Sequence, residues 1–164
     1  MAERFATRLW KRDQGLWPNP SPEGDPVHRS LGWLDLPDRL PILEEQFRGL
    51  STKLKSEGFT DVVVLGMGGS SMATLALLES SISVSRNPDH GLRLSTLDTT
   101  NPETISSVAE TLDLTRTLFF VSSKSGTTIE PLSLEAFFRR RIELASSRPG
   151  FIAGKQNFVA LTDS

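Results

Sequence analysis

Apolar side chains follow two patterns that alternate along the chain, short continuous runs and longer stretches with helical spacing. The run DVVVLG at 61–66 is continuous and rich in β-branched residues, which is typical of a strand buried on both faces of a sheet. Further short apolar runs predict strands at 92–98, 117–122 and 157–163.

Helical spacing separates these runs. Leu43, Phe47, Leu50 and Leu54 recur every three or four residues and predict a helix that ends near Gly58. Three more helices are predicted, one around Met72–Leu78, one at 101–112 that starts with Asn101 as its cap, and one at 128–145 with Leu134, Phe138 and Ile142 on one face. Strands that alternate with helices indicate a parallel sheet covered by helices on both faces. The predicted fold class is therefore α/β, a three-layer α/β/α sandwich.

Residues 1–40 differ from the rest of the chain. Four prolines fall between positions 18 and 26, so regular helix or internal strand is disfavoured there. All three tryptophans also lie in this part, and aromatic side chains in an irregular segment usually pack it onto a larger body. We predict an N-terminal arm at 1–40 that packs on a domain formed by residues 41–164.

Composition excludes several classes of protein. The 164 residues include no cysteine and two histidines, which argues against a disulfide framework and against a metal site. The net charge of −2 gives no electrostatic reason to expect a nucleic acid as partner. The N-terminus lacks the apolar core of a signal peptide, and no stretch approaches the length of a membrane helix. We expect a cytoplasmic protein with no membrane partner.

Two polar turns follow predicted strands, GMGGSSM after 61–66 and SSKSGTTIE after 117–122. Ligands of parallel sheets bind at the carboxyl ends of the strands. The start of a helix offers unpaired N–H groups and a partial positive charge, which together favour an anion such as phosphate. Short hydroxyl side chains add donors, and Lys124 adds one positive charge. The second turn is therefore predicted to hold a phosphate.

A helix cap also explains part of the second turn. Thr127 and Glu130 have the spacing of a capping box. Alternatively Thr128 is the cap, and Pro131 then occupies the third helical position, where its missing N–H is harmless. One cap accounts for one or two of the five hydroxyl groups at 122–128, so the excess favours an anion site.

The first turn only partly matches a dinucleotide fingerprint. Gly66 and Gly68 fit G-x-G-x-x-G, but Ser71 occupies the third glycine position. The nearest acidic residue at the end of a predicted strand, Asp98, lies farther along than the fingerprint requires. The glycines could equally serve only a tight strand-to-helix turn.

Four segments, LGMGGSSMA, LDTTNPETI, FFVSSKSGTTIE and FVALTD, resemble in their order and spacing the first sugar-isomerase (SIS) domain of glucose-6-phosphate isomerases. The segments RLWKRDQGLW and LGWLDLP are similar to the isomerase part of bacterial transaldolase/glucose-6-phosphate isomerase fusions. The resemblance covers nearly the whole chain. It implies an SIS-type, flavodoxin-like sandwich around a generally five-stranded parallel sheet, and neither a metal nor another cofactor.

The resemblance also implies a substrate, glucose 6-phosphate interconverting with fructose 6-phosphate through an enediol. Carried over position by position, it implies phosphate contacts from Ser123, Ser125 and Thr128, support from Lys124 and Thr127, and sugar contacts from Gly68, Gly69 and Ser70. Gly126 stands where many members carry a larger residue, which leaves the shape of this loop open.

Isomerisation moves a proton between adjacent carbons and needs a carboxylate base. Glu130 is the carboxylate beside the predicted phosphate site and is the candidate catalytic residue of this chain, although a capping role competes. The resemblance places the principal base beyond residue 164, in a longer protein with a second SIS domain. We therefore expect residues 1–164 to bind the sugar phosphate without turning it over.

The resemblance makes the second SIS domain a partner and a homodimer the candidate assembly. Two alternatives stay open, a stand-alone SIS module that senses a sugar phosphate and a dinucleotide-binding domain. Ser71 and the position of Asp98 disfavour the second.

Overall fold

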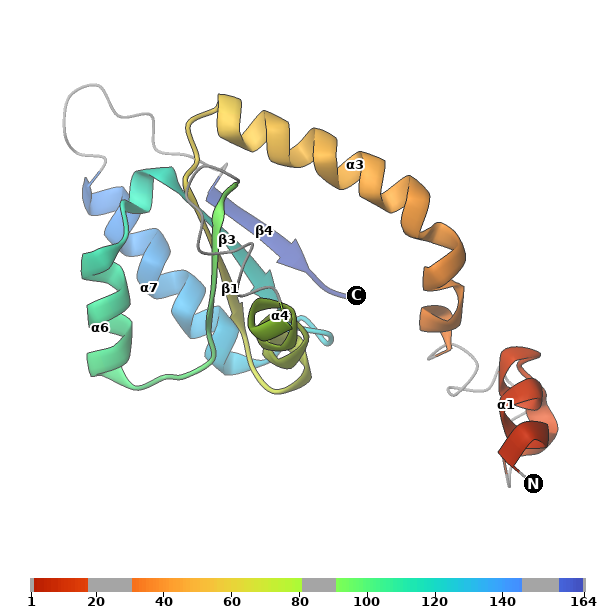
Figure 1. Cartoon of the computed structure of the whole chain (residues 1–164). Helices are drawn as coiled ribbons and strands as arrows, with labels where there is room; N and C mark the ends of the chain where they lie inside the picture. Colours follow the sequence, from red (N-terminus) through yellow and green to blue (C-terminus); the bar gives the residue numbers. More distant parts are fainter. Residues whose placement is uncertain (1, 18–30, 81–90, 146–156, 164) are drawn as a thin grey trace. The chain divides into compact units, whose positions relative to one another are not determined.

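The structure, a computed structural model, describes residues 2–17, 31–80, 91–145 and 157–163 (Figure 1). The chain divides into two compact units, Met1–Gly49 and Leu50–Ser164. Each unit is considered by itself below. The prediction that residues 1–40 pack as an arm on the rest of the chain stays a prediction.

The first unit is more helical than its sequence suggests. Its described residues hold α1 (Ala2–Trp10), the 3-10 turns η1 (Gln14–Leu16) and η2 (Gly32–Asp35), and the beginning of α3 (Leu36–Ser56). α3 starts before the predicted apolar stripe and contains Pro41. Helix α1 was not predicted. The proline-rich stretch at 18–26 lies outside the described residues.

A parallel sheet organises the second unit, and four strands of it lie in the described residues. Its strands are β1 (Asp61–Gly66), β2 (Arg93–Leu97), β3 (Thr117–Ser122) and β4 (Phe158–Leu161), in the spatial order β2-β1-β3-β4. All three strand pairs are parallel. The predicted α/β class and all four predicted strands are confirmed, with bounds within a few residues of those expected.

Helices cover both faces of this sheet. The second unit contains α4 (Gly69–Ser80), α6 (Pro102–Thr111) and α7 (Ile129–Ala145), with a 3-10 turn, η4 (Leu114–Arg116), before β3. Because β2 and β3 lie on opposite sides of β1, right-handed crossovers place α4 on one face and both α6 and α7 on the other. Figure 1 shows α6 and α7 together on one side of the strands. The three-layer arrangement is confirmed.

The main core lies between the sheet and α7. The stripe predicted on this helix is confirmed, since Leu134, Phe138 and Ile142 are all buried. Phe138 stacks on Phe119 of β3 with ring centroids 4.7 Å apart. A smaller cluster on the opposite face joins Leu54 to the sheet. This packing fixes where α7 begins relative to the end of β3.

Two polar contacts hold the outer strands. Asp61 of β1 is buried and pairs with Arg93 of β2 at 2.8 Å, and the hydrogen bond and charge of Asp61 raise the pKa of Arg93. Asn157, immediately before β4, is also buried, and its Nδ2 donates to the carbonyl oxygen of Thr117 at 2.8 Å. Both contacts lie near the amino ends of the strands.

Candidate functional site

The strand register brings the two polar turns together. Gly66, the last residue of β1, is paired with Ser122, the last residue of β3. The segments that follow, Met67–Ser70 and Ser123–Thr128, therefore leave the sheet side by side at the edge where ligands of parallel sheets bind. The structure therefore places the two turns next to each other, and that they form one ligand site stays a prediction.

The first turn is built around a left-handed glycine. Gly68 has φ of +55°, a conformation that glycine adopts without steric cost, and α4 begins at the next residue. Ser71 is buried and its hydroxyl donates to the carbonyl oxygen of Gly68 at 2.9 Å. Ser71 thus closes the turn, while Gly68 and Gly69 are exposed and Ser70 is half-buried. These three predicted site residues lie at the open edge of the sheet.

Gly66 lies close to the start of α4. A Cβ atom at this position would lie 3.1 Å from the Cβ of Ser70 and 3.3 Å from its carbonyl group. We expect Gly66→Ala to lower the free energy of unfolding by about 1–3 kcal/mol, because the start of α4 must shift. Urea denaturation measures this, with Gly49→Ala, where an added Cβ meets no atom within 4 Å, as the control. Equal losses for both variants would contradict the close approach.

The second turn uses another left-handed glycine. Gly126 has φ of +67°, and its N–H donates to the carbonyl oxygen of Ser123 at 3.1 Å. The left-handed backbone accounts for a glycine here, because a side chain at this φ is strained. α7 begins at Ile129, which makes Thr128 the preceding residue, and the buried Pro131 occupies the third helical position. This arrangement matches the alternative in which Thr128 precedes the helix.

The hydroxyl groups of the second turn bind one another. Ser123 is buried, donates its Oγ hydrogen to Oγ1 of Thr128 at 2.9 Å, and accepts from the Thr128 N–H at 3.4 Å. Ser125 Oγ lies 2.9 Å from Thr127 Oγ1 and accepts from the Thr127 N–H at 3.2 Å. Because a hydroxyl has one hydrogen, Thr128 keeps its own hydrogen for an outside acceptor, and so does one member of the Ser125–Thr127 pair.

The charges around this turn are few. Lys124 is exposed, and no carboxylate of the described residues forms an ion pair with it. Glu130, the candidate catalytic carboxylate, is half-buried in the first turn of α7. Within the described ranges, no group of three His, Cys, Asp or Glu side chains is arranged to hold a metal ion. The turn therefore combines one cation and several hydrogen-bond donors, which suit a small anion, with two acidic residues nearby, Glu130 and Asp163.

The end of β4 also contacts this turn, which the sequence reading did not predict. The Asp163 N–H and the Thr162 hydroxyl both donate to the carbonyl oxygen of Lys124, at 3.2 Å and 3.3 Å. The contact is between segments far apart in sequence. The sequence does contain a clue to this contact. The predicted strand at 157–163 ends in polar residues, and the carboxyl ends of parallel strands meet at the edge of the sheet where ligands bind.

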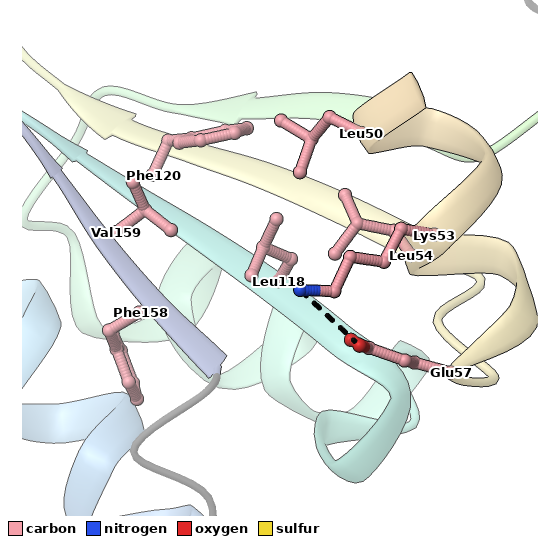
Figure 2. A pocket seen from close by; sticks show the side chains of 8 residues that line it. All are labelled: Leu50, Lys53, Leu54, Glu57, Leu118, Phe120, Phe158 and Val159. Carbon is pink, nitrogen blue, oxygen red and sulfur yellow. Dashed lines mark ion pairs between the residues drawn. The ribbon is translucent and has the colours of Figure 1, made fainter. Parts of the chain in front are cut away.

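An apolar groove provides a second candidate site, with different chemistry. It has a volume of about 420 Å³ and is lined from the end of α3, β3 and β4 by Leu50, Lys53, Leu54, Glu57, Leu118, Phe120, Phe158 and Val159 (Figure 2). Its charged members, Lys53 and Glu57, lie 3.9 Å apart and neutralise each other. The groove shares no residue with the two turns, and its lining does not suit a polar anionic ligand.

The fold and the two turns define a parallel α/β domain with an anion-suited helix start at its ligand edge. A family model described as phosphoglucose isomerase matches residues 38–164, and the chain belongs to this family. The glucose-6-phosphate isomerase of Chlamydia pneumoniae is 31% identical over 128 residues, which are 78% of this chain and 23% of the relative. A glucose-6-phosphate isomerase of Thermus thermophilus is 38% identical over 108 residues, 66% of this chain and 24% of the relative.

Solved structures agree with this assignment. A crystal structure of a glucose-6-phosphate isomerase from Chlamydia trachomatis is 27% identical, with a TM-score of 0.57, over 96% of this chain and 26% of that chain. A hypothetical protein from Thermus thermophilus is 26% identical, with a TM-score of 0.64, over 98% of this chain and 34% of that chain. The chain spans about a quarter of the length of the curated relatives it matches. None of the helices in the described ranges is long and apolar enough to cross a membrane.

Proposed function

We propose that this chain supplies the sugar-phosphate-binding part of a glucose-6-phosphate isomerase. The observation that carries the proposal is the pairing of Gly66 with Ser122, which sets the glycine turn and the hydroxyl turn next to each other at the ligand edge. Family membership supports the substrate class, glucose 6-phosphate and fructose 6-phosphate.

The roles of the turn residues follow from their contacts. Thr128 has a hydroxyl hydrogen available for a phosphate oxygen, and the Ser125–Thr127 pair provides one more. Ser123 would reach the phosphate only by giving up its bond to Thr128, so its contribution is mainly to hold that residue. Lys124 adds the positive charge.

The first turn takes the sugar side of the ligand in this proposal. Gly68 and Gly69 leave the backbone open to close approach, and the half-buried Ser70 adds a hydroxyl at the start of α4. The glycine turn is at the end of β1 and the hydroxyl turn at the end of the adjacent β3, so one hexose phosphate can contact both.

The residues that transfer the proton are proposed to lie mainly outside residues 1–164. Glu130 is the carboxylate nearest to the hydroxyl turn in sequence, but it lies in the first turn of α7, where a negative charge is favourable for the helix itself. We propose that the principal base comes from a second SIS domain of the same protein and that the assembly is a homodimer. A transaldolase fusion partner remains a prediction.

A thermal-shift comparison tests the proposed ligand. Fructose 6-phosphate should raise the melting temperature most, inorganic phosphate less, and NAD not at all, because stabilisation grows with ligand concentration over the dissociation constant. The same samples should convert no glucose 6-phosphate. Stabilisation by NAD alone would overturn the proposal in favour of a dinucleotide site, and turnover by the purified chain would overturn the assignment of the base to another domain.

A further inference from the structure

The carbonyl oxygen of Lys124 is held by two donors from the residues that follow β4. The Asp163 N–H lies 3.2 Å from this oxygen and the Thr162 hydroxyl lies 3.3 Å from it. One residue earlier, the Ser123 N–H donates to the carbonyl oxygen of Leu161 at 3.0 Å. The parallel pairing of β3 with β4 therefore continues past the sheet into the hydroxyl turn.

These contacts orient the peptide between Lys124 and Ser125. In a trans peptide the C=O and N–H bonds point in opposite directions. Because the Lys124 carbonyl points to β4, the Ser125 N–H points away from β4. Within the described part of the chain this N–H has no hydrogen-bond partner, unlike the N–H groups of Gly126 and Thr127.

The other end of β4 is fixed as well. Asn157, just before the strand, is buried, and its side chain donates to the Thr117 carbonyl at the start of β3. Phe158 stacks on Phe119 with centroids 5.1 Å apart. β4 thus provides a well-anchored support for the turn that follows β3.

We propose that Thr162 and the Asp163 N–H are positioning groups for the sugar-phosphate site. They hold the Lys124 carbonyl toward β4, which presents the Ser125 N–H as a backbone donor to the anion and fixes the point from which the Lys124 side chain extends. The ligand in this inference rests on the proposed function, whereas the orientation of the peptide does not.

Two pairs of variants test the Thr162 hydroxyl and the Asp163 N–H. In each pair, one variant removes the group and the other keeps it. Thr162→Val removes the hydroxyl and Thr162→Ser keeps it, whereas Asp163→Pro removes the N–H and Asp163→Ala keeps it. We expect Thr162→Val and Asp163→Pro to weaken binding of fructose 6-phosphate and of inorganic phosphate by about two- to tenfold. Thr162→Ser and Asp163→Ala should bind within about twofold of the original chain.

The control is Thr111→Val, which removes another exposed hydroxyl that donates to a backbone carbonyl, that of Val108 at 3.0 Å. Calorimetry gives the affinities and urea denaturation the stabilities. Weaker binding by Thr162→Val than by Thr111→Val, at matched stability, supports the proposal. Equal affinities for these two variants overturn it.

A second readout needs no ligand. The amide resonance of Ser125 should shift, and exchange at the Gly126 amide should accelerate, in Thr162→Val but not in Thr111→Val. If the original chain binds neither fructose 6-phosphate nor phosphate, the proposed function fails while this readout still judges the positioning role. Unchanged amide signals in Thr162→Val would overturn that role.

Discussion

Replacing Ser125 and Thr128 together by alanine will weaken binding of fructose 6-phosphate by about tenfold or more. A hydrogen bond from a hydroxyl group to a phosphate is worth about 1.5–3 kcal/mol, so the loss of the Thr128 bond alone weakens binding by about a factor of ten or more. Thr128 has its hydrogen available because Ser123 donates to it, and Ser125 shares one available hydrogen with Thr127. Isothermal titration calorimetry measures the loss directly.

The matched control is Ser106→Ala combined with Thr111→Ala. Both residues are exposed hydroxyls on α6, so this double variant should bind as the original chain does. Unchanged affinity in the Ser125/Thr128 variant would leave helix capping as the explanation for the hydroxyl-rich turn. A loss of stability without a loss of affinity would support the same conclusion.

The second unit was largely predictable from its sequence because its signals are local. β1 is a continuous run of β-branched residues, and every one of its residues is buried. Asn101 caps α6 as predicted, accepting from the N–H groups of Glu103 and Thr104 at 3.0 Å each. In such segments the residues that favour a helix or strand also form its local contacts, as Asn101 does with the backbone N–H groups. The sequence pattern and the structure therefore agree.

The first unit was less predictable, and proline is the reason. The stripe from Leu43 to Leu54 indicates a helix, but Pro37 and Pro41 argue against extending it backward. α3 nevertheless begins at Leu36. Pro37 falls in the first turn, where an N–H is unpaired anyway, while Pro41 costs one helical hydrogen bond. Its ring also crowds the carbonyl four residues earlier, and the whole penalty of an interior proline is about 3 kcal/mol, yet α3 continues through Pro41 over 21 residues.

The positions of the two turns could be predicted from the sequence, but their internal contacts could not. The hydroxyl excess and the glycines mark both turns as candidates, because an anion site at a helix start needs small donors and an accessible backbone. The partners of each hydroxyl depend on backbone geometry that residue types do not specify. Buried Ser123 thus pairs with Thr128, five positions away, and the end of β4 reaches Lys124 from the far side of a crossover.

Phe138→Ala will lower the free energy of unfolding by about 3–5 kcal/mol, because truncating a buried aromatic side chain leaves a cavity. Phe138 is fully buried, stacks on Phe119 at 4.7 Å and meets Phe137 edge-on at 5.2 Å. A domain of this size has a total stability of about 5–15 kcal/mol, so the loss is a large share of it. Urea denaturation followed by circular dichroism measures the change.

Leu144→Ala on the same helix is the control, because Leu144 is 57% exposed. Its loss should stay below about 1 kcal/mol, as for other surface substitutions. Equal losses at the two positions would mean that α7 does not pack on β3 through Phe138. The position of the hydroxyl turn beside the glycine turn would then rest on the register of β1 and β3, without support from the packing of α7.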